Sequence, residues 1–473
     1  MSDTAKTTLP PGPPLPMVVQ SALMAGFGLR FLSWCQRRYG KMFTLRIPLS
    51  GRVVYLADPA DIKTVYAGDP RVFHSGEAHW FFRGLLGESS LFVLDEDAHH
   101  ALRRLTMPAF HRDAVAQQAA QMTEIAAANI AGWQVGKSFP VAPKTTEITL
   151  EVILRTVIGA SDPARLAALR RVVPRLLYMK PWETPAITKP SLRRHRPWRK
   201  VGRRFAEADT LLYAEIADRR ADPNLAERTD VLAMLVRATD DDGRSMSDSE
   251  LRDQLLTAIA AGHETTATAL SWALERLTRH PVALDKAVQA ADASAAGDPA
   301  GDEYLDAVIK ETLRIRPVLF SSGRVLKESI EIGGYQLPSD IMVDPAIGLV
   351  HASAEVYRDP ERFDPDRMVG AALSPTTWLP FGGGNRRCLG ATFAMVEIRL
   401  VLREILRRVE LGTTDAADEK QRAKHVTFVP HRGGMIHVRA IRNATPLSTE
   451  SMAPQCPANV QRSPNSPESH PRR

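Results

Sequence analysis

The sequence predicts a mainly α-helical protein with small β-sheets at one side, folded as a single domain. From about residue 58 to 320, most of the chain carries apolar residues at three- and four-residue spacing, the period of an amphipathic helix. Short alternating segments bounded by turn residues lie before and after this region, where strands are expected. The 473 residues contain no internal repeat and no clean linker. We therefore expect one mixed α+β domain.

The expected strands begin with FTLRI (43–47) and VVYLA (53–57), which flank a Ser50–Gly51 turn signal. Two later segments, ESIEIGGYQLP (328–338) and FVPHRGGMIHV (428–438), each place two glycines between strand-like runs. Paired glycines favour the tight turn of a β-hairpin. The sequence thus predicts two hairpins after residue 323.

The expected helices include residues 149–160, 211–221 and 250–277, followed by a final helix over 391–408. A proline-rich leader precedes them over residues 1–16, because prolines are excluded from helix interiors. The folded domain is expected to span residues 17–442. Residues 443–473 have little apolar surface to bury and predict a disordered tail.

Composition favours an intracellular globular protein. Apolar residues make up 44% and charged residues 24% of the chain, and the three cysteines are odd in number and far apart. This pattern argues against a disulfide framework and for a reducing compartment. The charge-free stretch Met17 to Leu29 is too short to cross a bilayer, so we expect a short core or interfacial helix. The expected location is cytoplasmic, with at most peripheral membrane contact.

A basic run, RRHRPWRKVGRR, occupies residues 193–204 and contains no acid. Such a run can bind nucleic acid or an anionic membrane, but a lone charge run is more often a solvated loop and helix start. No nucleic-acid motif accompanies it, so no nucleic-acid partner is expected.

The stretch FGGGNRRCLG (381–390) sets Cys388 among glycines and arginines, just before a strongly helical segment. A helix N-terminus favours a thiolate, which can act as a nucleophile or as a metal ligand. A zinc site needs further cysteines nearby, whereas one thiolate suffices for haem iron. A dinucleotide fingerprint is excluded because Arg387 stands where it requires glycine.

Two further clusters carry polar residues on helices. AGHETT (261–266) places Glu264 and Thr265 in the middle of an otherwise apolar helix, a plausible place for proton delivery. A zinc-protease helix is excluded because Ala267 stands where the second histidine belongs. Threonine can bond a carbonyl one turn back. Glu311 and Arg314 form an i, i+3 pair that means little by itself.

Together, in this order and spacing, these motifs resemble the cytochrome P-450 family of haem-thiolate monooxygenases. The resemblance runs from PPGPPLP (10–16) to about residue 440 and is nearest to soluble actinobacterial, mycobacterial-like members. It implies the cytochrome P-450 fold as a single haem-binding domain that carries heme b (iron protoporphyrin IX). The haem-loop pattern is filled by Phe381, Gly384, Arg386, Cys388 and Gly390.

The resemblance also implies roles for these residues. Cys388 is the expected iron ligand, and the glycines let the backbone pass closely under the porphyrin. The haem propionates are expected to contact Arg386, Arg324 and the pair His99 and Arg103, where His99 replaces the tryptophan of many members.

On the oxygen-activating helix, Thr265 is expected to hydrogen-bond dioxygen. Glu264, where many members carry aspartate, is expected to organise proton delivery. Glu311, Arg314 and Arg367 of FDPDRM are expected to form a structural network.

The resemblance implies an oxygen-dependent hydroxylase that receives electrons from an external ferredoxin and ferredoxin reductase, since little chain remains after about 440 to fold a reductase domain. A basic face including Arg104 and Arg387 is expected to dock the ferredoxin. The implied pocket segments contain aromatic residues, which favours a lipophilic small-molecule substrate: Trp80, Phe81, Phe82, Phe92, Tyr178, Trp182, Phe320 and Phe428. The alternatives are a peroxide-using or a non-catalytic haem protein of the same fold.

Overall fold

The structure is a computed structural model that describes residues 9–48, 50–320, 322–424 and 426–442. The α-helices are α1 (Met17–Phe27), α2 (Leu29–Tyr39), α3 (Pro59–Ala67), α4 (Ser75–Ala78), α5 (Arg83–Leu86), α6 (Glu96–Thr106), α7 (Arg112–Ala116), α8 (Ala119–Ile130), α9 (Ala142–Val152), α10 (Pro163–Leu177), α11 (Pro185–Thr188), α12 (Arg199–Ala221), α13 (Val231–Arg237), α14 (Asp248–Arg279), α15 (Pro281–Ala295), α16 (Pro299–Ile315), α17 (Ile347–His351) and α18 (Ala391–Arg408). The shorter turns are η1 (Trp80–Phe82), η2 (Met107–Phe110), η3 (Ile153–Val157, a π-helix), η4 (Pro181–Glu183), η5 (Pro190–Arg194), η6 (Pro365–Met368) and η7 (Gly384–Arg386).

The strands are β1 (Met42–Ile47), β2 (Gly51–Leu56), β3 (Phe73–His74), β4 (Ser138–Pro140), β5 (Arg324–Leu326), β6 (Ile330–Ile332), β7 (Tyr335–Leu337), β8 (Met342–Pro345), β9 (Val409–Gly412), β10 (Gln421–Lys424), β11 (Thr427–Pro430) and β12 (Met435–Ile441). The largest sheet has the order β1-β2-β8-β5-β3, and only its β2–β8 pair is parallel. The predicted architecture, mainly α with small sheets, is confirmed.

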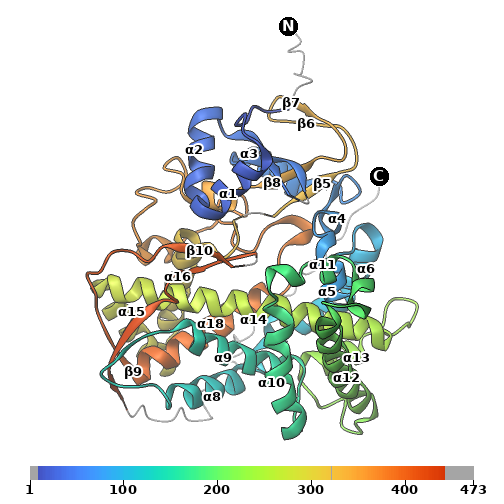
Figure 1. Cartoon of the computed structure of the whole chain (residues 1–473). Coiled ribbons are helices and arrows are strands. Elements are labelled where there is room, and N and C mark those ends of the chain that lie inside the picture. Colours follow the sequence, from blue (N-terminus) through green and yellow to red (C-terminus); the bar gives the residue numbers. More distant parts are fainter. Residues whose placement is uncertain (1–8, 49, 321, 425, 443–473) are drawn as a thin grey trace, which may run out of the picture.

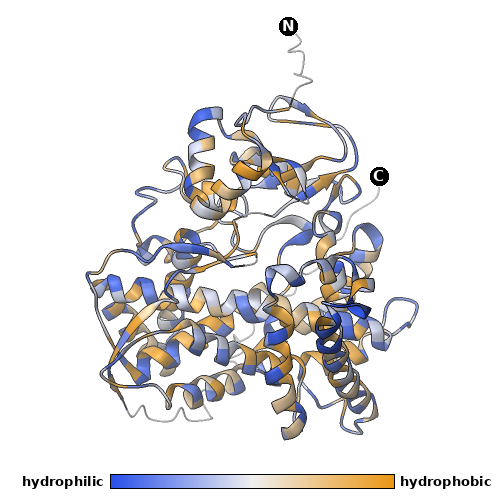
Figure 2. Ribbon diagram, viewed as in Figure 1, coloured by the Kyte–Doolittle hydropathy of each residue, from blue (hydrophilic) through white to orange (hydrophobic). Residues whose placement is uncertain are grey.

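Two parts are visible in Figure 1. The smaller one, at the top, joins α1, α2 and α3 to the five-stranded sheet, and the larger one consists of helices gathered around α14. Apolar faces of the large helices meet in one continuous core that extends from Leu85 to Val438. Hydrophilic residues lie mostly on the outer faces of these helices (Figure 2).

Helix α14 is the central element, and its sequence explains its length. Ser247 accepts the backbone N–H of Glu250 while the Glu250 carboxylate accepts the N–H of Ser247, a capping box that fixes the first turn. The 32 residues reach about 48 Å at 1.5 Å per residue. Helix α14 packs against α9, α12, α16 and α18, so it brings distant parts of the chain to one centre.

One of the two predicted hairpins is confirmed and the other is wrong. Strands β6 and β7 pair across Gly333 and Gly334, whose φ values of +56° and +78° suit this turn. Strands β11 and β12 instead join different sheets, β11 with β10 and β12 with β4 and β9. The carboxylate of Glu419 accepts the N–H groups of Gly434 and Met435, so it holds this turn open.

The structure describes the second half of the expected leader and none of the expected tail. Within the expected leader, residues 9–16 are attached to the sheet, because Thr44 donates its N–H to Pro11 O and its hydroxyl to Pro10 O. The predicted tail, 443–473, lies outside the described residues. In the described part of the chain, no helix combines the length and hydropathy that a bilayer crossing requires.

Candidate functional site

Cys388 lies three residues before α18, at the helix start that the sequence predicted. Its N–H donates to Phe381 O at 2.9 Å, which closes the loop on itself. The side chain of Cys388 is exposed. Enclosure by the loop raises the pKa of Cys388, while the Gly390 N–H and the guanidinium groups of Arg103 and Arg387 oppose this rise.

The glycines of this loop serve the packing of the chain itself. Gly382 and Gly384 both have φ of +64°, a conformation that L side chains rarely adopt. A Cβ on Gly384 would stand 1.9 Å from the backbone oxygen of Tyr66, and one on Gly383 would stand 2.2 Å from the Tyr66 ring. At Gly390 the same test meets open space. Close approach to α3 therefore explains Gly383 and Gly384 without any bound group.

Two cationic side chains are held near the loop by carbonyl oxygens. Arg386 donates to Leu94 O at 2.6 Å and forms an ion pair with Asp95. Arg324 is only 4% exposed, donates to Ser322 O and Gly323 O, and forms no ion pair within 4.0 Å among the described residues. Burial lowers the pKa of Arg386 to about 10, and burial also lowers that of Arg324.

His99 lies beside this positive cluster. It is 2% exposed, and its Nδ1 has no hydrogen-bond partner in the described part of the chain. Burial and the neighbouring Arg386 and Arg103 lower its pKa to about 3, so the ring is neutral at pH 7. Arg103 donates to Arg387 O at 2.9 Å and so joins α6 to the cysteine loop.

On α14, Thr265 donates to Ala261 O at 2.6 Å, the predicted bond to the preceding turn, and the helix remains α-helical throughout. Glu264 forms an ion pair with Lys424 of β10 at 3.0 Å and accepts a weaker bond from Thr427 at 3.4 Å. Ala261 is exposed in the middle of a helix whose residues 266–278 are buried.

A second polar group borders the same turn of α14. His263 is fully buried, contacts the Thr149 hydroxyl through Nδ1 at 3.1 Å and the Tyr178 hydroxyl through Nε2 at 3.3 Å. Burial and the charge of Lys424 lower the pKa of His263 to about 4. The Lys424 ammonium also lies 3.9 Å from the centre of the Tyr178 ring. These contacts join α9, α14 and β10 around Glu264.

The structure brings Glu311, Arg314 and Arg367 together. Arg314 forms two bonds of 2.7 and 2.8 Å with Glu311, both side chains are fully buried, and Arg367 lies 3.2 Å from the same carboxylate. Arg314 also donates to His351 O, and His351 Nε2 accepts the N–H of Leu379 at 2.9 Å. The network thus reaches the segment directly before the cysteine loop.

Several residues of this region were missed by the sequence analysis. They are Asp95, which pairs with Arg386; Lys424, which pairs with Glu264; Thr149, which contacts His263; and His351. None stands in a local motif that announces such a partner. Of the expected aromatic residues, Phe320 and Phe428 stack at 3.6 Å, whereas Trp80 and Trp182 are exposed by 41% and 49%.

The residues present fit the haem that the sequence motifs imply. Haem carries two negative propionates, which match the buried, unpaired charge of Arg324. The iron takes a thiolate ligand, and the Cys388 thiol is accessible at the same loop. The unpartnered Nδ1 of His99 offers a further polar contact beside the cations. No feature of these side chains conflicts with the group.

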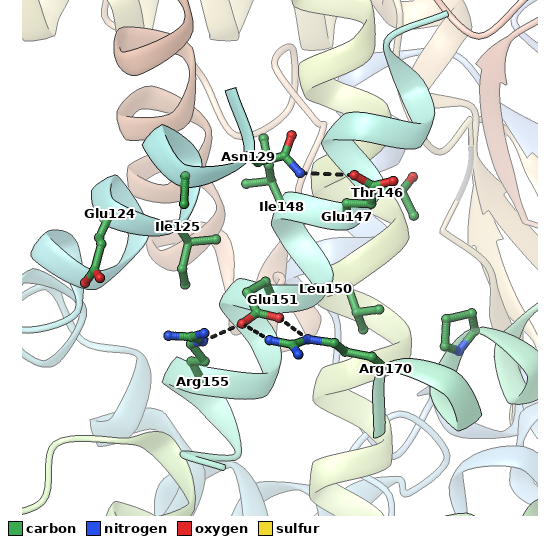
Figure 3. A pocket seen from close by; sticks show the side chains of 12 residues that line it. Glu124, Ile125, Asn129, Thr146, Glu147, Ile148, Leu150, Glu151, Arg155 and Arg170 are labelled. Atoms are coloured by element: carbon green, nitrogen blue, oxygen red, sulfur yellow. Dashed lines mark hydrogen bonds and ion pairs between the residues drawn. The ribbon is translucent and has the colours of Figure 1, made fainter. Parts of the chain in front are cut away.

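A cavity of about 540 Å³ elsewhere carries none of these residues (Figure 3). It opens between α8, α9 and α10, and Glu151 in its wall forms ion pairs with both Arg155 and Arg170. None of the expected site residues lines it.

Comparison with known proteins places the chain among its relatives. The family model for cytochrome P450 matches residues 10–437. "Putative cytochrome P450 135B1" of Mycobacterium tuberculosis is 68% identical over 459 residues, 97% of each chain, and "Putative cytochrome P450 138" of the same species is 38% identical over 91% of this chain and 96% of the relative.

Solved structures agree in fold. "Retinoic acid bound cyanobacterial CYP120A1" matches with a TM-score of 0.78 at 23% identity over 92% of this chain and all of that one. The cytochrome P450DA heme domain matches with a TM-score of 0.77 at 25% identity, over 92% of this chain and 98% of its own. The cytochrome P-450 fold expected from the motifs is thus confirmed. The chain belongs to the cytochrome P450 family, and it is a haem-containing monooxygenase of that family.

Proposed function

We propose that the protein uses heme b to insert one oxygen atom from O2 into a lipophilic organic substrate, with electrons from a ferredoxin and its reductase. The observation that carries the proposal is the accessible Cys388 thiol at a loop flanked by the buried cations Arg324 and Arg386. When bound, the haem supplies oxygen activation, which the electron density of an axial thiolate favours.

Residues of the chain hold and orient the haem. Cys388 is the metal ligand; the Phe381 carbonyl accepts its backbone N–H, and the Gly390 N–H faces its thiol. Gly384 permits the packing of that loop against α3. The propionates are held by Arg324, Arg386, His99 and Arg103. Charge-assisted bonds of this kind are the strong ones in proteins, so each contributes to haem retention.

Proton delivery is assigned to Glu264 and Thr265. The Thr265 hydroxyl donates its one hydrogen to the carbonyl of the exposed Ala261, so it would turn away from that carbonyl to donate to a bound oxygen atom. Glu264 carries the nearest carboxylate along the same helix and is 14% exposed. The Glu311–Arg314–Arg367 network is structural, because its side chains hold the segment that leads to the cysteine loop.

The redox partner is proposed to dock beside the cysteine loop. Arg387 is exposed there, and Arg104 follows Arg103, which binds the Arg387 carbonyl. Arg104 also pairs with Asp241 at 2.9 Å on the exposed surface. Such exposed cations steer an acidic partner in a salt-dependent way. A cytoplasmic location fits a soluble ferredoxin donor.

The substrate class rests on the aromatic pair Phe320 and Phe428, which stack near the joint between α1 and α2. Pockets lined by such side chains bind apolar ligands. Glu264 and Thr265 are both present, which favours the oxygen-dependent reaction over the peroxide-using alternative.

The carbon monoxide difference spectrum of the reduced protein tests the ligand. The wild type should give the red-shifted Soret band of thiolate-bound haem, and Cys388→Ser should lose it. Cys35→Ala, which changes the buried cysteine of α2, should keep it. A haem-loaded, folded wild type without the band would overturn the proposal. Substrate-dependent consumption of O2 with ferredoxin and reductase then separates a monooxygenase from a peroxide-using or non-catalytic protein.

A further inference from the structure

Helix α1 exposes four large apolar side chains. Val18 is 74% exposed and Phe27 59%, while Met17 and Val19 are each exposed by at least 40%. The helix contains no charged residue, and its one buried residue is the polar Gln20. Leu23 and Met24 pack, partly buried, against a core cluster, as the apolar stripe of a surface helix normally does. The segment therefore combines a core contact with an exposed apolar side.

Gln20 helps to fix the orientation of α1. Its amide donates to Leu15 O at 2.8 Å and to Pro13 O at 3.2 Å, and its carbonyl accepts the N–H of Arg46 at 2.9 Å. These bonds attach the polar side of α1 to β1 and to the proline-rich segment. The apolar side is consequently held outward rather than free to turn inward.

Helix α2 continues the surface with positive charge. Its inward side buries Phe31, Leu32 and Cys35, and its outward residues follow helical spacing: Arg30, Trp34, Arg37 and Arg38. None of these three arginines forms an ion pair within 4.0 Å in the described part of the chain. The sequence from residue 9 to 57 contains no aspartate or glutamate. No carboxylate within this stretch of sequence therefore competes with an external anion for the three arginines.

Trp34 lies on the same side of α2 as these arginines, and α2 directly follows the apolar α1. Trp34 is 43% exposed, with its ring stacked on Phe31 at 6.0 Å and edge-on to Tyr39 at 6.0 Å. Tryptophan at the border of apolar and charged surface is typical of the lipid headgroup level. The two helices pack against each other in the smaller part, with α1 on its lower side in this view (Figure 1), and hydrophobic residues occupy much of α1 (Figure 2).

We propose that α1 and α2 form a peripheral docking surface for an anionic lipid bilayer. Eleven residues reach about 16 Å, half of what a hydrocarbon core requires, so α1 lies in the plane of the interface and does not cross it. Its apolar side enters the boundary between headgroups and acyl chains. Arg30, Arg37 and Arg38 contact anionic headgroups. This inference stands independently of the proposed reaction.

Vesicle flotation of the full-length protein tests the contribution of the three arginines to lipid binding. The probes are vesicles of phosphatidylcholine alone and of phosphatidylcholine with phosphatidylglycerol. The wild type should float with the second kind only and should dissociate as salt is raised. The triple variant Arg30→Gln, Arg37→Gln and Arg38→Gln should bind at least about tenfold more weakly, since each cation near an anionic surface contributes.

A matched triple variant controls for net charge. Lys63→Gln, Arg112→Gln and Lys137→Gln remove the same charge from exposed positions outside α1 and α2, and this variant should float like the wild type. Equal loss in both triple variants would overturn the proposal, as would equal binding to both kinds of vesicle.

The contribution of the exposed apolar side chains of α1 to lipid binding is tested separately. Val18→Ser with Phe27→Ser should weaken flotation several-fold, whereas Val135→Ser with Val282→Ser, at positions exposed by 52% and 72%, should not. Because all four side chains are exposed, the thermal midpoint should stay unchanged in both variants.

Two other occupants are outcomes of the same series. Light scattering measures the oligomeric state. If the wild type is a dimer and Val18→Ser with Phe27→Ser makes it a monomer, the surface binds a second copy of the chain. A further variant changes five cations of the basic run 193–204 to glutamine: Arg194, Arg196, Arg199, Lys200 and Arg203. If flotation is lost only in this variant, lipid binding belongs to that run. Either result would overturn the proposal.

Discussion

The ammonium of Lys424 lies 3.0 Å from the carboxylate of Glu264 and joins the tip of the β10–β11 pair to the middle of α14. Thr427 at the other side of the same hairpin donates to this carboxylate at 3.4 Å. Lys424 is itself held 3.9 Å from the Tyr178 ring. The proposed proton-delivering group is therefore positioned by a segment far away in the sequence.

A double-mutant cycle tests this relationship. Glu264→Gln should lower turnover by about 10² or more, since general acid–base groups contribute at this level. Lys424→Met should lower it by about tenfold because the carboxylate loses its positioning partner. In the Glu264→Gln background, Lys424→Met should have no further effect on turnover. Additive losses would show that Lys424 acts by another route. The carbon monoxide spectrum of all three variants should stay that of the wild type.

The buried network should be costly to break. Glu311→Gln leaves the fully buried Arg314 without its negative partner, and such a loss costs about 3–5 kcal/mol. Urea unfolding of the haem-loaded protein measures it. The control is Glu355→Gln, which removes an exposed partner of Lys41 and should change stability by less than about 1 kcal/mol. Similar unfolding midpoints for the two variants would contradict a structural role of the network.

Gly382 and Gly384 have the same φ but should differ in how far each tolerates replacement by alanine. Gly382→Ala places a side chain in open space and should cost about 1–2 kcal/mol for the left-handed conformation alone. Gly384→Ala adds a Cβ that would stand 1.9 Å from the Tyr66 carbonyl, so it should cost more and lower the bound haem per chain. Thermal midpoint and haem content measure both effects. A milder effect of Gly384→Ala would show that α3 is not a rigid neighbour.

His351 should make the fold sensitive to acid. Burial and the adjacent Arg314 lower its pKa from 6.5 to about 3, and the Tyr357 ring covers it. Below pH 6.5 the unfolded chain therefore binds a proton that the folded chain does not, so stability falls from pH 6.5 towards pH 3. At pH 4.5 this amounts to about 3 kcal/mol.

His351→Gln removes the titrating group and can still accept the Leu379 N–H. Its unfolding free energy should fall by about 2 kcal/mol less than that of the wild type between pH 6.5 and 4.5. His195→Gln, at an exposed position, should follow the wild type. Chemical denaturation at a series of pH values gives both curves, and a His351→Gln curve parallel to the wild type would refute the assignment.

Much of the molecule was predictable because its signals are local. The 3.6-residue period marked α14 and α18, two glycines marked the β6–β7 turn, and the spacing of the haem-loop motif marked Cys388. Each of these depends on residues within a few turns or strands of one another. The sequence also singled out Glu311, Arg314 and Arg367, which the structure brings to one carboxylate.

Only the tertiary structure decided which distant groups meet. The glycine turn at 433–434 looks like a hairpin, but the Glu419 carboxylate takes its N–H groups and separates the strands. Helix α1 reads equally as core or surface, and its three bonds through Gln20 help to fix which side lies outward. Periodicity reports which side of an element is apolar. It does not report what that side faces, or which partner Lys424 or Asp95 contacts. These depend on packing between segments that no local pattern connects.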